Sequence, residues 1–216
     1  MTTSLPLLER VTEHSLSALP NVAEAYSPSE GRYRVALNTS DESFLLTNRS
    51  FDIINNWMGD RLHESITERL AEGEEVRVID IGAGYDARAA SEILATHPSP
   101  RLSVYAIDLF AQEKSEKDPR LTIIRGDFRT LSLPVNSFDL LYSCQLMEYL
   151  YQQKDPAAFE AYALFFHMLK PGGEACIDDY WRLTNAADFI RTLGAQESRT
   201  VREGKAFSHP HVYFKR

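Results

Sequence analysis

The sequence has only two cysteines, Cys144 and Cys176, among its 216 residues. Two cysteines make no disulfide framework, and no Cys/His spacing in the chain is typical of a zinc site. The first residues, MTTSLPLLERVTEH, carry acidic and polar side chains where a signal peptide needs a continuous apolar run. No segment approaches the roughly 18 consecutive apolar residues of a membrane helix. These absences predict a metal-free cytoplasmic protein with no membrane partner.

Positive charge is also scarce, because 23 Lys and Arg residues stand against 31 Asp and Glu residues, for a net charge of −8. Nucleic-acid binding requires Lys and Arg concentrated on one face, so the composition predicts no nucleic-acid partner. A hydrophobic fraction of 44% and a charged fraction of 25% are ordinary for a globular protein. The length suits one α/β domain with an extension, as a monomer or a homodimer.

Strands alternate with helices in the pattern that follows Gly73. This alternation predicts right-handed crossovers and a Rossmann-like, mostly parallel α/β sheet with helices on both faces. The last two predicted strands form a pair. The predicted strands cover residues 76–82, 101–108, 121–127, 137–144, 174–181, about 197–202 and 211–215, and the predicted helices cover 86–97, 156–170 and 184–194.

Residues 1–50 differ from the rest, with Ser, Thr, Asn and Pro clusters and only short apolar runs. Residues 5–19 predict an amphipathic helix that Pro20 ends, and the apolar spacing over 52–70 predicts another helix. We therefore expect an N-terminal helical extension, residues 1–50, that acts as a lid over a domain of residues 51–216.

Glycines or acids lie at the carboxyl ends of the first three strands of the predicted sheet. Ligands of parallel sheets bind outside the carboxyl ends of the strands. Gly82 and Gly84 lie directly after the first strand, where they permit a tight turn and the close approach of a ligand. Asp108 ends the second strand, where a carboxylate can accept hydrogen bonds from both hydroxyls of an adenosine ribose. Asp127 ends the third strand, where it can receive the amino group of an adenine.

Five motifs, in this order, resemble the class I S-adenosylmethionine-dependent methyltransferases: VIDIGAGYDA, the acid in VYAIDLF, GDF, SFDLLYS and LKPGG. The resemblance covers about residues 54–216. It implies a seven-stranded sheet of order 3-2-1-4-5-7-6 with its last strand antiparallel. It also implies S-adenosyl-L-methionine as the cofactor, with its methyl group moved to O, N, C or S of an acceptor. Together with the acidic charge and the motifs that are missing, we expect O or N of a small molecule such as an amino acid, a peptide or a natural product.

Carried over residue by residue, the resemblance places Asp80 near the methionine ammonium and Asp108 on the ribose diol. Leu109 would pack on adenine, and Asp127 with Phe128 would define the adenine edge. The implied cofactor-binding residues are Asp80, Gly82, Ala83, Gly84, Arg88, Asp108, Leu109, Asp127, Phe128, Ser143 and Cys144.

Arg88 enters this set through GAGYDAR, which is similar to the GAG-x-D-[AT]-R motif of the leucine carboxyl methyltransferase-like group. In that group the Arg binds the cofactor carboxylate. The sequence departs from the family at Asp86, which replaces a frequent third glycine.

Acidic and aromatic side chains follow the fourth and fifth strands, where they could bind a polar or cationic acceptor or take up its proton. A helix-preceding turn and a solvated surface acid are the plain alternatives for these positions. The candidate catalytic residues are Glu148, Asp178, Asp179 and Tyr180.

The glycine loop has a second interpretation, because GAGYDA also fits the dinucleotide fingerprint G-x-G-x-x-[GA] with Asp108 as the ribose acid. This alternative is an NAD-dependent oxidoreductase, and it would put Asp80 close to a pyrophosphate. A non-catalytic partner subunit with the same fold is a further alternative. Neither Asn/Asp-Pro-Pro-[Tyr/Phe] nor Pro-Cys follows the fourth strand, which favours a small-molecule or peptide acceptor over a nucleic acid.

Overall fold

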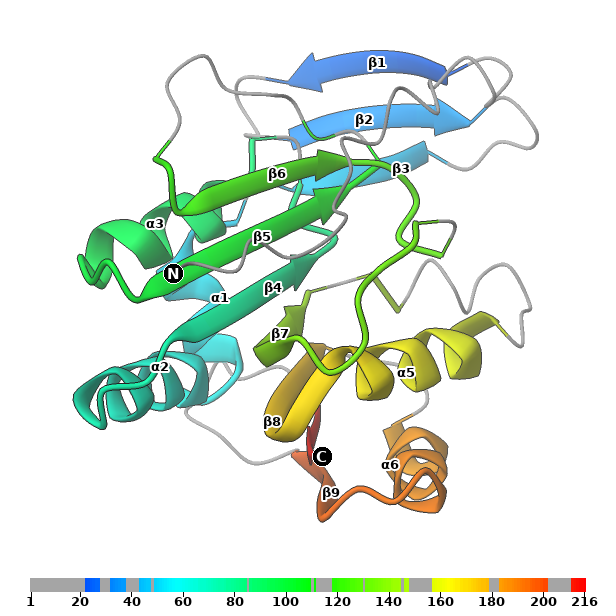
Figure 1. The fold of residues 1–216 in the computed structure, drawn as a ribbon. Helices are drawn as coiled ribbons and strands as arrows, with labels where there is room; N and C mark the ends of the chain where they lie inside the picture. Colours follow the sequence, from blue (N-terminus) through cyan, green and yellow to red (C-terminus); the bar gives the residue numbers. More distant parts are fainter. Residues whose placement is uncertain are drawn as a thin grey trace.

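The structure is a computed structural model that describes residues 22–27, 32–37, 43–47, 49–84, 86–109, 111, 118–129, 131–144, 146–147, 157–178, 183–201 and 211–216. These residues form a three-stranded sheet, a seven-stranded sheet and five helices (Figure 1). The smaller sheet is antiparallel, in the order β1-β2-β3. Its strands are β1 (Val22–Ser27), β2 (Arg32–Leu37) and β3 (Ser43–Thr47).

The larger sheet has the order β6-β5-β4-β7-β8-β10-β9. Numbered along this sheet alone, that order is 3-2-1-4-5-7-6, so the predicted topology is confirmed. The last strand runs antiparallel to both of its neighbours, whereas the other pairs are parallel. The strands of the larger sheet are β4 (Val76–Ile81), β5 (Leu102–Asp108), β6 (Leu121–Arg125), β7 (Phe138–Ser143), β8 (Leu169–Asp178), β9 (Glu197–Val201) and β10 (His211–Lys215).

Helices cover both faces of this sheet (Figure 1). One buried cluster joins Val76 and Val78 of β4 to side chains of α1, α2 and α3. The other joins Ile79 and Ile81 of the same strand to side chains of α5 and α6. Successive side chains of a strand point to opposite faces, so the two clusters lie on opposite sides of the sheet. The helices are α1 (Phe51–Trp57), α2 (Arg61–Ala71), α3 (Arg88–Thr96), α5 (Ala157–Met168) and α6 (Leu183–Thr192).

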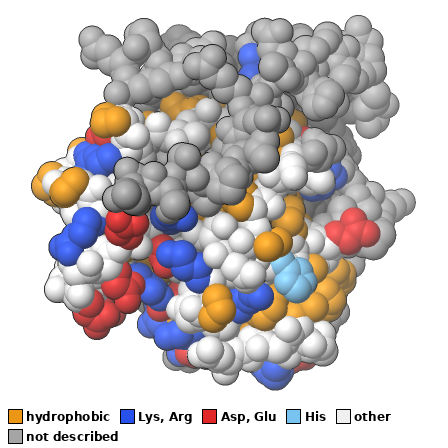
Figure 2. Space-filling view, in the orientation of Figure 1, with side chains coloured by type: hydrophobic (Ala, Val, Ile, Leu, Met, Phe, Trp, Pro, Cys, Tyr) orange, Lys and Arg blue, Asp and Glu red, His pale blue; other side chains and the backbone are white. Residues whose placement is uncertain are grey.

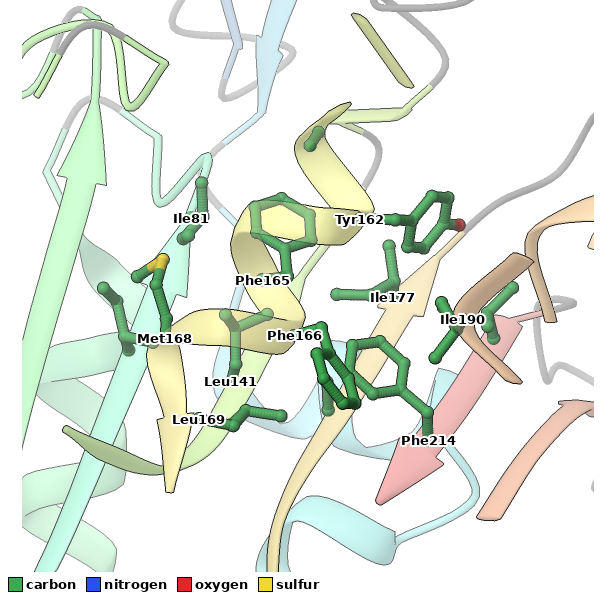
Figure 3. Close-up of a cluster of buried hydrophobic side chains, with 14 of the residues drawn as sticks. Ile81, Leu141, Tyr162, Phe165, Phe166, Met168, Leu169, Ile177, Ile190 and Phe214 are labelled. Atoms are coloured by element: carbon green, nitrogen blue, oxygen red, sulfur yellow. The ribbon is translucent and has the colours of Figure 1, made fainter. Parts of the chain in front are cut away.

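The α5 face of the sheet has an aromatic-rich core. In Figure 3, Phe165 and Phe166 of α5 lie over Leu141 of β7 and Ile177 of β8, with Phe214 of β10 beside them. All six residues of β7 are buried. A strand that is covered on both faces is the expected position for a mainly apolar run such as FDLLYS. This packing fixes the carboxyl ends of the central strands in place.

Two sequence-predicted elements differ from the structure. The single helix expected over 52–70 is split into α1 and α2, because Gly59 and Asp60 adopt left-handed backbone angles with φ of +68° and +65°. The fifth strand begins earlier than predicted, at Leu169, since LKPGG is extended and pairs with β7 across a register shift. A Cβ on Gly173 would lie 3.0 Å from the Phe138 carbonyl oxygen, so this close approach of two strands requires glycine.

The N-terminal extension is partly a sheet rather than helical. The helix predicted over 5–19 lies outside the described residues, whereas residues 22–47 contain β1, β2 and β3. Their sequences, VAEAYS, RYRVAL and SFLLT, mix apolar, β-branched and aromatic residues over stretches too short for a helix. The predicted domain boundary at residue 50 stays a prediction.

A buried carboxylate attaches α2 to the sheet. Glu174 of β8 accepts hydrogen bonds from Arg61 at 3.1 Å, Arg69 at 3.4 Å, Ser65 at 3.3 Å and the Tyr213 hydroxyl at 3.0 Å. Burial opposes the ionisation of Glu174, but the Tyr213 hydrogen bond and the two arginines outweigh it and lower the pKa of this carboxyl. The four donors therefore hold Glu174 in its charged form between α2 and β8.

The visible face of the molecule carries charge of both signs. Lys and Arg side chains lie beside Asp and Glu side chains over the lower left of the described surface (Figure 2). Within the described part of the chain, none of the helices has the length and apolar character that crossing a membrane requires.

Candidate active site

The loop between β4 and α3 is held against the end of β5. The amides of Gly82 and Ala83 donate to the Ile107 carbonyl at 2.8 and 3.1 Å, and the Gly84 amide donates to Asp108 Oδ2 at 2.9 Å. Gly82 and Gly84 have φ of +84° and +76°, angles that side chains with a Cβ rarely adopt. The predicted glycines are therefore required by the backbone conformation of this loop.

Asp108 lies at the centre of this arrangement. Its side chain is buried, and its carboxylate fixes the glycine loop through Gly84. Its backbone carbonyl accepts from the Gly126 amide at 3.0 Å, which ties the end of β6 to the same point. Leu109 follows directly and is 37% exposed, one of the three large hydrophobic side chains in the described residues with such exposure. An acid and an exposed apolar side chain thus lie next to each other at the end of β5.

Asp80 is the most buried acid of the site, with 1% of its surface exposed. Asp80 Oδ2 accepts a hydrogen bond of 2.7 Å from the hydroxyl of Tyr142, which is also fully buried. Burial raises the pKa of the Asp80 carboxyl to about 8, the Tyr142 hydrogen bond opposes this rise, and the negative charge of Asp108 adds to it. Burial and the charge of Asp80 also raise the pKa of the Tyr142 hydroxyl well above 10.

The end of β7 meets the end of β8 through a thiol and a carboxyl. Cys144 Sγ lies 3.6 Å from Asp178 Oδ2 and donates to it. Burial and the charge of Asp178 raise the pKa of the Cys144 thiol well above 9, so the thiol stays protonated at neutral pH. His211 is directly opposite Asp178 in the β8–β10 pair, and both side chains are buried.

Two predicted cofactor residues, Ser143 and Phe128, contact other parts of the domain in this structure. The fully buried Ser143 hydroxyl donates to the Ile81 carbonyl at 2.7 Å. Phe128 is buried in the core against Phe165, with 5.5 Å between the ring centroids. These two side chains therefore contribute to packing within the domain.

Arg88 and Asp127 each form an ion pair with a neighbour in the sequence. Arg88 Nε donates to Glu92 Oε1 at 2.7 Å. Arg129 donates to both carboxylate oxygens of Asp127 and lowers the pKa of that carboxyl. The structure places both residues at the predicted edge of the sheet, with their charges already paired.

Three of the four candidate catalytic residues, Glu148, Asp179 and Tyr180, lie outside the described residues. Asp178 is described and lies at the carboxyl end of β8. In the described part of the chain, no group of three or more His, Cys, Asp or Glu side chains is arranged to hold a metal ion.

Sequence reasoning missed Tyr142 and His211 as members of the site. Tyr142 lies beside Asp80 in the β4–β7 register, and His211 lies beside Asp178 in the β8–β10 register. The signal was present only in the strand order, because neighbouring strands bring their terminal residues together across the sheet.

A model of the methyltransferase domain family matches residues 79–177, from the middle of β4 to the penultimate residue of β8. This range contains the glycine loop, both buried acids and their tyrosine partner. This match supports the resemblance of the chain to the class I S-adenosylmethionine-dependent methyltransferases. The cofactor of this family is S-adenosyl-L-methionine.

Several solved structures are similar to this chain at low sequence identity, and one of them, SibL, shares its fold. The methyltransferase SibL in its apo form is 16% identical, with a TM-score of 0.50, and the match covers 71% of this chain and 54% of SibL. The arsenic(III) methyltransferase of Chlamydomonas reinhardtii is 16% identical, with a TM-score of 0.40 and coverage of 66% and 62%. The 1,6-didemethyltoxoflavin-N1-methyltransferase of Burkholderia thailandensis is 15% identical, with a TM-score of 0.48 and coverage of 90% and 99%.

The match thus spans less than two thirds of the length of SibL and of the arsenic(III) methyltransferase. A comparison with curated protein sequences finds no match.

Proposed function

We propose that this methyltransferase domain binds S-adenosylmethionine at the carboxyl ends of β4 and β5 and methylates O or N of a small-molecule acceptor. The observation that carries the cofactor assignment is the buried Asp80 carboxyl directly before the glycine loop, with Asp108 beside it. A cationic ligand would pair with Asp108 and with an Asp80 that ionises beside it, whereas a pyrophosphate would be repelled by Asp108 and would gain nothing from Asp80. This charge arrangement argues against the NAD-dependent alternative.

The residues of the site fit the parts of this cofactor. Asp108 would accept hydrogen bonds from the ribose hydroxyls while its Oδ2 continues to hold the Gly84 amide. Leu109 offers an exposed apolar surface on which an adenine can pack. Asp80 would lie near the positively charged methionine portion. When bound, the cofactor supplies a methyl group that its sulfonium has already activated, so the protein's main task is to orient the reactants.

The acceptor side of the proposed site lies at the ends of β7 and β8. Asp178 and His211 are an acid and an imidazole on the same face of two paired strands. An imidazole beside a carboxylate can take up the proton that an O–H or N–H acceptor loses. We therefore assign the acceptor's proton to this pair. Glu148, Asp179 and Tyr180 stay candidates for contact with the acceptor.

The cofactor assignment is tested by isothermal titration of the purified chain with S-adenosylmethionine and, separately, with NAD. We expect binding of the sulfonium compound alone. Asp108→Ala should weaken it by about 1.5–3 kcal/mol, or roughly 10- to 150-fold, because a charged hydrogen-bond acceptor is lost. Asp188→Ala is the control, since Asp188 forms an exposed ion pair with Arg191 on α6.

NAD binding in place of S-adenosylmethionine would support an oxidoreductase, and binding of neither would support a non-catalytic subunit.

The acceptor assignment is tested with a panel of small phenols, acids and amines, by following formation of S-adenosylhomocysteine. With any accepted compound, Asp178→Asn and His211→Gln should lower kcat and leave cofactor affinity within about twofold. Loss of cofactor affinity alone would place this pair outside the acceptor site.

A further inference from the structure

Tyr142 and Asp80 form a buried acid–tyrosine pair within the central strands. They are direct neighbours in the parallel β4–β7 register, and the hydroxyl donates to Asp80 Oδ2 over 2.7 Å. Neither side chain has appreciable contact with solvent. The hydrogen bond fixes the direction of the carboxyl group, and the two strands fix the hydroxyl. The orientation of Asp80 is therefore set by the fold before any ligand arrives.

Among the described residues, the ionisable groups that act on this pair are acidic or neutral. Asp108 of β5 acts on Asp80, and Glu92 of α3 and Cys144, which follows β7, act on Tyr142. Arg49 acts on Cys144. Among the described groups, those that act most directly on Asp80 are thus another acid and a tyrosine. Such surroundings favour a protonated carboxyl until a cation is placed beside it.

We propose that Tyr142 is a positioning residue for Asp80, and that Asp80 releases one proton to solvent when the cationic cofactor binds. This inference rests on the proposed function. The O–H bond of the Asp80 carboxyl breaks, its proton passes to the buffer, and the carboxylate that remains is paired with the positive charge of the ligand. Tyr142 keeps its own proton throughout and donates to the carboxylate.

A tyrosine suits this role because it is a neutral donor. An Arg or Lys beside Asp80 would orient the carboxyl equally well, but it would neutralise the charge and repel a cationic ligand. A phenylalanine would remove the donor that Tyr142 gives this buried carboxylate, at the cost of a lost hydrogen bond to a buried charge. The raised pKa of the Tyr142 hydroxyl keeps it a donor across the working pH range.

The test is isothermal titration of the intact chain with S-adenosylmethionine at pH 6.5, in phosphate and in imidazole buffer. The two buffers differ in ionisation enthalpy, so the difference in observed heat gives the number of protons released. The ligand's amino group is almost fully protonated at this pH, because α-amino groups titrate near 7.7–8.0. We expect close to one proton released per ligand bound, and an affinity that rises nearly tenfold per pH unit between pH 5.5 and 6.5.

Two variants separate positioning from a merely structural role. Asp80→Asn should bind more weakly and release no proton. Tyr142→Phe should weaken binding and move the pH at which affinity levels off to a higher value, because the hydrogen bond no longer favours the carboxylate. Tyr162→Phe is the matched control, since Tyr162 is a fully buried tyrosine in the cluster on the opposite face of the sheet.

Binding without proton release would overturn the inference and leave the proposed function standing. An unchanged pH profile in a folded Tyr142→Phe would remove the positioning role. No binding of S-adenosylmethionine by the wild-type chain would instead contradict the proposed function itself. If Asp80→Asn does not fold, the proton count of the wild-type chain and the Tyr142→Phe profile still decide the question.

Discussion

The buried carboxyl of Asp80 should make the ligand-free protein less stable as the pH rises. An aspartate ionises near 3.8 in the unfolded chain, whereas burial keeps Asp80 protonated up to about 8 in the native state. Between these values the native state binds one more proton than the unfolded state. The contribution of Asp80 to the free energy of unfolding is therefore fully present below about pH 4. It then falls by about 1.4 kcal/mol per pH unit until about pH 8.

Between about pH 4 and pH 7 this slope lowers the free energy of unfolding by about 4 kcal/mol in total. The two pKa values of Asp80 differ by about 4 units, and roughly 3 of those pH units have been crossed at pH 7. Asp80→Asn removes the titrating group while its amide oxygen can still accept from Tyr142. The amide NH₂ needs new partners, which costs about 1–3 kcal/mol at every pH. The slope, rather than the absolute difference, is thus the quantity that reports the buried carboxyl.

The assay is urea unfolding of both proteins without ligand, at pH 5, 6, 7, 8 and 9. The free energy of unfolding of the variant minus that of the wild type should increase by about 1.4 kcal/mol per pH unit up to about pH 8, then stay constant. Asp188→Asn provides the control for an exposed aspartate. Parallel pH profiles for the wild type and Asp80→Asn would refute the reasoning, because they would mean that Asp80 ionises normally in the folded protein.

Two further substitutions test the loop and the attachment of α2. Gly82→Val should abolish S-adenosylmethionine binding in titration calorimetry, because valine rarely adopts a φ of +84°. Gly194→Val is the control: it has a φ of +96° after α6 and should leave binding intact. Equal effects of the two substitutions would show that backbone strain, and not the site, is responsible. Glu174→Ala should lower the free energy of urea unfolding by about 3–5 kcal/mol, since Arg61 and Arg69 lose their shared carboxylate, and a loss below about 1 kcal/mol would contradict the network. Because the pKa of Glu174 is lowered, its own contribution should be lost as the pH falls below about 4.5.

The strand order and the place of the glycine loop could be predicted from the sequence. Buried strands such as VRVIDI and FDLLYS are read from short apolar runs, and right-handed crossovers then leave few possible orders for a parallel sheet. Asp80 and Asp108 could be placed at the same edge because each stands at a strand's carboxyl end. Their burial and the Gly84 contact depend on how tightly the loop closes, which no residue pattern gives.

The contacts of individual side chains were harder to predict. Ser143 and Phe128 stand at the correct strand ends, but their side chains point into the protein. Their position in the sequence gives the end of the sheet on which they lie and not the direction of the side chain. Tyr142 could be recognised only once the β4–β7 register was known. The helix break at Gly59 and Asp60 is local, yet the apolar spacing on either side continues in phase and conceals it.

A crystal structure of the chain with bound S-adenosylhomocysteine tests the central claim most directly. It should show the ribose hydroxyls on the Asp108 carboxylate, the adenine against Leu109 and the amino group beside Asp80. The nucleoside lying elsewhere, or Asp80 and Asp108 both making no contact with it, would contradict the account.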